Sequence, residues 1–138
     1  MLHQLLKLNH PHKFNSLNRW NFIKNGLLIV SLAVCFIVDR TFFFYPPALA
    51  STWNSICFDA TGLIAGLVVL MCGVFNLHVD LLVKLGLGIS VAFLTVLLVA
   101  EMFHVVGAGY FRFHPSIIFE IYSIVNLMEL AFEYQPRC

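Results

Sequence analysis

The stretch LLVKLGLGISVAFLTVLLVAEMF, residues 81–103, carries only two charged side chains, Lys84 and Glu101. An α-helix rises about 1.5 Å per residue, so about 20 apolar residues cross a hydrocarbon core about 30 Å thick. The stretch is therefore long enough to span a membrane, and it predicts a transmembrane helix.

Three further segments are similarly apolar, and all four together are residues 26–45, 56–75, 81–103 and 116–132. The last is the weakest of them because it contains Glu120, Asn126 and Glu129. We therefore expect an all-α, polytopic integral membrane protein with four transmembrane helices.

The composition supports the same class. The chain has 138 residues, 60% of them hydrophobic and only 11% charged, whereas soluble domains have about 45–50% apolar and about 25% charged residues. A chain of this length has room for one domain, and most of its surface needs the lipid bilayer as solvent. The formal net charge of +1 gives no support for binding nucleic acid.

The segments between the predicted helices are short, the longest being HVVGAGYFRFHP at 104–115. Short connections place successive helices side by side in opposite directions, which predicts an up-down-up-down bundle over residues 26–138. Residues 1–25 are expected to form a cytoplasmic or interfacial arm. A signal peptide cleaved after the small residues 48–50 is a competing interpretation, but Asp39 and Arg40 interrupt its apolar run.

Lysines and arginines predict the orientation, because they gather in cytoplasmic loops. They are concentrated before the first helix, at the start of the third and in the tail, namely Lys7, Lys13, Arg19, Lys24, Lys84 and Arg137. Both ends are therefore predicted to be cytoplasmic, in a multi-pass protein of the cell membrane, with an organelle membrane left open.

Charged side chains are costly inside hydrocarbon, at least about 2.5–3.5 kcal/mol at its centre, so their positions are informative. Counted along the predicted helices, the carboxylates lie within roughly 10 Å of one plane near the outer ends. The predicted outer polar cluster is Asp39, Arg40, Asp59, Glu101, His104 and Glu120. Either Arg40 pairs with these acids structurally, or the cluster handles a proton, a cation or a polar substrate.

Two further surfaces are predicted from helical spacing. Gly62, Gly66 and Gly73 share a face of the second helix with Asp59, and such small residues allow close helix packing. On the fourth helix Tyr122, Asn126 and Glu129 form a polar stripe turned away from Glu120, which predicts contact with a second copy or with a larger membrane-protein partner.

No motif for catalysis, phosphate binding or redox chemistry is found, so no catalytic residue, cofactor or metal is predicted. The four cysteines are far apart, and the NHPH run at 9–12 is weak evidence for a metal site.

We expect a non-catalytic accessory or assembly subunit of a membrane complex. The alternative is a small oligomeric transporter or channel coupled to protons or cations. A membrane lesion former similar to a holin is less favoured, because the tail lacks a strongly charged end. The similarity to holin-like proteins and to small multidrug transporters is one of size and span number only.

Overall fold

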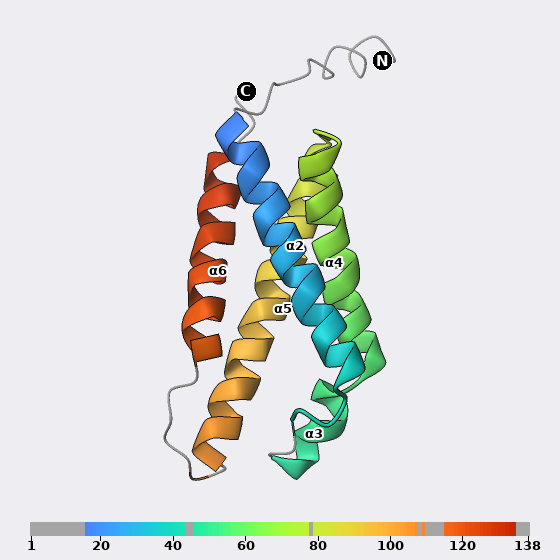
Figure 1. Ribbon diagram of the computed structural model, residues 1–138, viewed down its shortest axis with the longest axis vertical. Coiled ribbons are helices and arrows are strands. Elements are labelled where there is room, and N and C mark those ends of the chain that lie inside the picture. The colour runs from blue at the N-terminus through green and yellow to red at the C-terminus, as the bar shows by residue number, and fades with distance from the viewer. Residues whose placement is uncertain (1–15, 44–45, 78, 108, 110–114, 135–138) are drawn as a thin grey trace.

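The computed structural model describes residues 16–43, 46–77, 79–107, 109 and 115–134. Within these ranges the secondary structure is entirely helical: α2 Ser16–Val38, α3 Pro47–Trp53, α4 Ile56–Val74, α5 Asp80–Gly107 and α6 Pro115–Glu133 (Figure 1). All but α3 are long and apolar enough to cross a membrane. The prediction of an all-helical chain with four such helices is confirmed.

Three of the predicted spans agree with α4, α5 and α6 to within a few residues, but the first does not. It was expected at 26–45, whereas α2 begins at Ser16 and ends at Val38. The Asp39 carboxylate accepts hydrogen bonds from the backbone N–H of Thr41, at 3.2 Å, and from its hydroxyl, at 3.0 Å. This local turn competes with further helix, so Asp39 and Arg40 follow the helix and do not lie within it.

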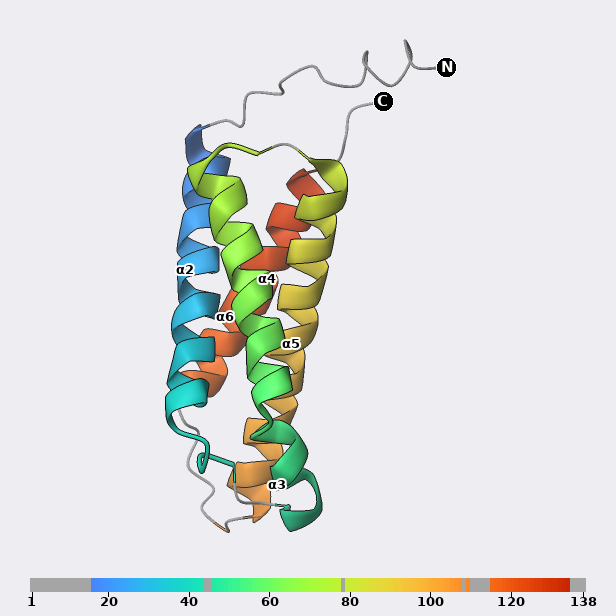
Figure 2. The same ribbon diagram turned by 90° about the vertical axis from the view of Figure 1, so that its right-hand side faces the viewer.

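Hydrogen bonds between helix ends fix how neighbouring helices lie. Arg19, at the start of α2, donates to the carbonyl oxygens of Gly73 at 3.0 Å and Val74 at 2.9 Å, at the end of α4. Tyr134, just after α6, donates its hydroxyl to Asp80 Oδ1 at the start of α5, at 3.0 Å. The end of the bundle opposite these contacts holds α3 and is called the α3 end below (Figures 1 and 2).

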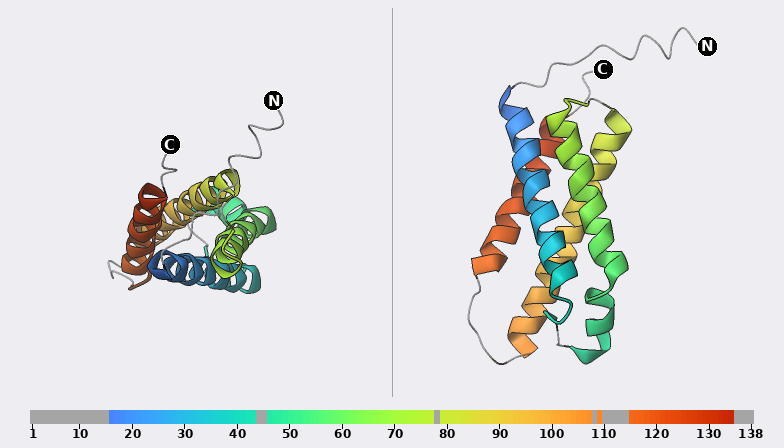
Figure 3. Two further views of the ribbon diagram at one scale, coloured as in Figure 1. Left: turned by 90° about the horizontal axis from the view of Figure 1, so that it is seen from above. Right: turned by 45° about the vertical axis from the view of Figure 1, so that its right-hand side comes forward.

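Seen along the bundle, the long helices form a ring in the order α2, α4, α5, α6 (Figure 3). α2 packs mainly on α4, and its contact with α6 is slight. The centre is filled by buried aliphatic side chains, among them Ile29, Val69, Leu94 and Leu127. Outward-facing positions carry large apolar side chains such as Ile64 and Phe119, as expected for helices surrounded by lipid.

α3 was not predicted, since its residues lie in the connection 46–55. Pro47 occupies its first turn, where a proline is favoured because the missing N–H needs no partner. Asn54 then holds the preceding segment in place: its amide donates to the Phe43 carbonyl at 2.6 Å and accepts from the Phe43 N–H at 3.3 Å. The Trp53 ring contacts the ring of the buried Phe43, with centroids 5.9 Å apart, so this connection is a folded part of the α3 end.

Candidate functional site

Three buried carboxyl groups lie toward the α3 end, one from each of α4, α5 and α6. Asp59, Glu101 and Glu120 expose 1%, 6% and 3% of their surface. We call them the carboxyl layer. Acidic side chains are seldom buried to this extent unless they are paired, so each needs a physical account.

Local sequence places two of these acids near helix beginnings. Ser55 caps α4 by accepting a hydrogen bond from the Phe58 N–H at 3.3 Å, which puts Asp59 in the first turn. Pro115 starts α6, and Glu120 follows in its second turn. The positive end of a helix dipole favours an acid at such positions.

Within the described ranges, Glu101 is the member of the carboxyl layer that has a hydrogen bond to another helix. Its Oε2 accepts from the Ser116 hydroxyl at 2.7 Å, which joins the end of α5 to the start of α6. This distance is typical of a well-formed O–H···O hydrogen bond. The bond accounts for the burial of Glu101 in structural terms.

Asp59 and Glu120 come from helices that both pack on α5. Gly62, three residues after Asp59 on α4, packs against Phe93 of α5. Ser116, four residues before Glu120 on α6, bonds Glu101 of α5. α4 and α6 are not neighbours in the ring (Figure 3), so these two buried acids belong to opposite helices.

Neither acid is fully satisfied by the described residues. Asp59 Oδ1 and Glu120 Oε2 are buried without a hydrogen-bond partner. Within the described ranges one salt bridge is formed, and it joins Lys84 to Asp80 at 3.8 Å, at the opposite end of the bundle. An unpaired buried carboxyl oxygen can accept a hydrogen bond, hold a proton or bind a cation.

The remaining members of the predicted cluster are placed differently. Arg40 is exposed, and its positive charge acts on the Asp59 carboxyl group. The charge that acts on Glu120 is the negative charge of Glu101. Asp39 is exposed and engaged with Thr41. Arg40 thus neighbours Asp59 without forming a salt bridge within 4 Å in the described part of the chain.

His104 belongs to an aromatic cluster at the α3 end. Its ring stacks on Phe42, with centroids 6.3 Å apart, and meets Phe43 edge to face at 6.4 Å. Trp53 and Phe103 extend the cluster, their centroids 6.3 Å apart. Tryptophan is enriched at membrane interfaces, so Trp53 in this cluster fits a position of the α3 end near the surface of a bilayer.

The glycines of α4 meet two different helices. Gly66 packs on Ile29 and Val30 of α2, and Gly73 packs on Phe22 and Ile23 of the same helix. Gly62 instead packs under the Phe93 ring of α5. The glycine face of α4 thus lies between α2 and α5, and it lets α4 approach both neighbours closely.

The polar stripe of α6 points outward. Tyr122 is 64% exposed, Glu129 is exposed and Asn126 is partly exposed, whereas Glu120 and Ser123 on the other side of the helix are buried. Nothing in the described part of the chain covers the Tyr122 and Glu129 side chains.

No three His, Cys, Asp or Glu side chains among the described residues lie together as metal ligands would. Cys35, Cys57 and Cys72 are free thiols. The NHPH run and Cys138 lie outside the described ranges.

Sequence reasoning missed two positioning residues. Arg19 was counted only as a charge for orientation, although it caps the last carbonyls of α4. Asn54 was treated as part of an unstructured connection, although its side chain bonds the backbone of Phe43 and holds it in place. The proline pair before 48–53 signals a helix start, but no local signal identifies the distant partner of Arg19.

No protein-family model, no curated protein and no solved structure matches this chain.

Proposed function

We propose that this chain is a non-catalytic accessory or assembly subunit, which binds a membrane protein or a second copy of itself through the polar stripe of α6. The observation that carries the proposal is the exposure of Tyr122 and Glu129 on the outward side of a helix long and apolar enough to cross a membrane. Polar side chains in hydrocarbon need hydrogen-bond partners, and neighbouring transmembrane helices supply them.

In this proposal the four long helices cross the cell membrane in up-down-up-down order with both chain ends in the cytoplasm. Arg19 and Lys24 near the start of α2, together with Lys84 in the first turns of α5, support that orientation. The aromatic α3 end then faces the outside.

The test is the size of the native assembly. The full chain is extracted from its own membrane in mild detergent, and the complex is measured by native mass spectrometry. We expect a defined species larger than the monomer, and we expect its loss in the double variant Asn126→Leu and Glu129→Leu. Thr95→Val, which removes an exposed polar group from α5, serves as the matched control. A wild-type chain that is purely monomeric would overturn the proposal.

A second candidate, a small oligomeric transporter coupled to protons or cations, is favoured by a separate observation. Asp59 and Glu120 are buried, and each keeps an unpaired oxygen in the described part of the chain. Intramembrane acids of this kind often mark ion pathways. The apolar filling of the bundle makes a pathway through one copy unfavourable, so this function needs an assembly.

Flux into liposomes tests the second candidate. Purified chain is reconstituted, and a pH-sensitive dye follows proton entry under an imposed gradient. Asp59→Asn and Glu120→Gln are expected to abolish flux, while Thr95→Val, at an exposed position of α5 outside the α6 stripe, leaves it unchanged. Absence of flux in the wild type, or equal flux in all variants, would exclude this candidate.

A further inference from the structure

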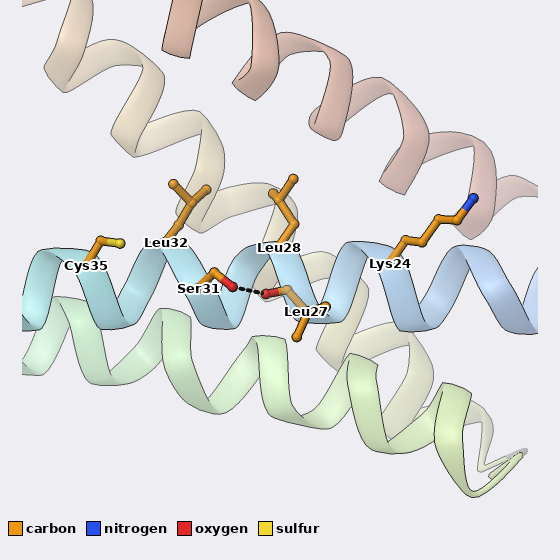
Figure 4. A pocket seen from close by; sticks show the side chains of 6 residues that line it. All are labelled: Lys24, Leu27, Leu28, Ser31, Leu32 and Cys35. Carbon is orange, nitrogen blue, oxygen red and sulfur yellow. Dashed lines mark hydrogen bonds between the residues drawn. The ribbon is translucent and has the colours of Figure 1, made fainter.

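The side of α2 that the other described helices leave uncovered carries four residues at helical spacing. Positions four, three and four apart lie on one face of a helix. We call them the α2 stripe: Lys24, Leu28, Ser31 and Cys35 (Figure 4). Leu28 is partly exposed and the other three are exposed, so this face is open to lipid or to a further helix.

The polar stripe of α6 has the same spacing. Glu133, also exposed, continues it one turn beyond Glu129, so its positions too are four, three and four residues apart. This spacing reads the same in both directions, so two antiparallel helices can match the stripes position by position. The resulting pairs are Lys24 with Glu133, Leu28 with Glu129, Ser31 with Asn126, and Cys35 with Tyr122.

The fold places the members of these pairs at nearly equal depth. The Phe22 ring of α2 meets the Tyr134 ring just after α6, with centroids 6.4 Å apart. Lys24 lies about 3 Å from that level along the axis and Glu133 about 1.5 Å, both toward the α3 end. Copies inserted the same way in a membrane keep these depths. The α2 stripe of one copy and the α6 stripe of another are therefore in register.

Charge distinguishes between the possible pairings of two copies. Lys24 lies within the apolar helix Arg19–Val38 and forms no salt bridge with the described residues. Two α2 stripes would bring the two Lys24 side chains together, and two α6 stripes would do the same for Glu129 and Glu133. Like charges facing one another oppose association. An α2 stripe against an α6 stripe instead sets one cation beside two acids that are four residues apart.

The remaining pairs match in size and in hydrogen bonding. Ser31 and Cys35 are small residues four apart, which allow a second helix to approach closely, and the larger Asn126 and Tyr122 stand opposite them. The Ser31 hydroxyl donates to the Leu27 carbonyl oxygen at 2.8 Å. Its oxygen can still accept a hydrogen bond from the Asn126 amide. Lipid tails offer neither an acid nor an acceptor to these side chains.

We propose that the α2 stripe of one copy binds the α6 stripe of a second copy, with Lys24 beside Glu129 and Glu133. This inference rests on the proposed function and deepens it, because it names the surface that covers the polar stripe of α6. Each copy offers one stripe of each kind, so the contact closes into a dimer or a ring.

Disulfide crosslinking between two differently tagged chains tests the pairing. One chain keeps Cys35 as its single cysteine, and the other carries Tyr122→Cys as its single thiol, with the remaining native cysteines replaced by alanine. The two are co-expressed and oxidised with copper-phenanthroline in the native membrane. We expect a covalent product that contains both tags, and none when Val99→Cys, at an exposed position of α5, replaces Tyr122→Cys.

The other outcomes contradict the pairing. Linkage of the Cys35 chain to itself would show that α2 stripes face one another, and linkage of the Tyr122→Cys chain to itself would show the same for α6 stripes. A wild-type assembly that gives no mixed product, or that holds a different protein at α6, would overturn this inference alone. A wild-type chain found only as a monomer would overturn the proposed function as well.

Charge reversal supplies an independent readout by native mass spectrometry. Lys24→Glu should disperse the assembly into monomers, and adding Glu129→Lys with Glu133→Lys should restore it, which also shows that the reversed chain folds. Lys84→Glu, at an exposed lysine of α5, is the control and should leave the assembly intact. Assembly that survives Lys24→Glu, or that the added reversals do not restore, would contradict the proposal.

Discussion

At the scale of single residues, the carboxyl layer is the least ordinary feature of the molecule. Glu101 has a clear partner in Ser116, at 2.7 Å. Asp59 has a cation in its neighbourhood, Arg40, but keeps one oxygen unpaired. Glu120 lies near the negative charge of Glu101, and its Oε2 is also unpaired. An incompletely satisfied buried group costs stability, so its presence calls for a role beyond packing.

Glu120→Gln tests this cost. The amide keeps the shape of the side chain and cannot ionise, so it avoids the cost of burying a carboxylate charge, and the free energy of unfolding should rise by about 1 kcal/mol at a pH at which the acid would be ionised. Thermal unfolding in detergent measures it. The exposed Glu129→Gln is the control and should change stability by less than about 0.5 kcal/mol. Destabilisation by Glu120→Gln would show that the carboxylate is already well paired.

At the scale of helices, the apolar pattern predicted the four long helices. It did not predict the ends of α2, which depend on polar side chains. α4 begins at Ile56, where the apolar run was expected to start, and the Ser55 side chain caps it there by accepting from the Phe58 N–H. The end of α2 was misplaced because Phe42 and Phe43 prolong the apolar run, whereas the Asp39 and Thr41 side chains end the helix at Val38. The start of α2 was missed because residues 16–25 are mostly polar, although Phe22 and Ile23 among them pack on Gly73 of α4.

The glycine contacts between α2 and α4 yield a prediction at this scale. A methyl group at Gly26 would collide with the Leu70 backbone, which cannot rotate away as a side chain could. Gly26→Ala is therefore expected to lower the free energy of unfolding by about 1–3 kcal/mol. Steric-trap or thermal unfolding measures the change.

Gly88 provides the matched control for that substitution. It lies in α5, and a methyl group added there meets nothing within 4 Å. Gly88→Ala should leave stability unchanged or raise it by up to about 1 kcal/mol, because alanine favours helix. Equal effects at Gly26 and Gly88 would contradict the close packing of α2 on α4.

The hydrogen bond between Tyr134 and Asp80 predicts a pH dependence. Burial, and then the hydrogen bond to Asp80 and its charge, raise the pKa of the Tyr134 hydroxyl above its ordinary value. A raised pKa in the folded state means that this contribution to stability is full below about pH 10, the ordinary tyrosine value, and is lost as pH rises beyond it.

Spectrophotometric titration checks this pH dependence. The tyrosinate absorbance of the folded chain should show a late alkaline phase that is absent in Tyr134→Phe, and the stability of the variant should fall less steeply above pH 10. Retention of the late phase in Tyr134→Phe would assign it to another tyrosine and refute the prediction.

At the scale of the whole molecule, four apolar helices form a filled ring whose outer surface carries the polar stripe of α6. The stripe could be predicted from the sequence because Tyr122, Asn126 and Glu129 recur at helical spacing. The close packing of α2 on α4 could not, because it depends on contacts of Gly26 and Gly66 with residues far away in the sequence. The acids of the carboxyl layer could be predicted from the sequence. Their individual partners, such as Ser116 for Glu101, could not.

The central claim is that protein, not lipid, covers the polar stripe of α6, and photo-crosslinking in the native membrane tests it most directly. A benzophenone amino acid at position 122 should give a discrete protein adduct. The same group at Val99, an exposed apolar position on α5, should give none. Adducts to lipid alone at both positions would contradict the account.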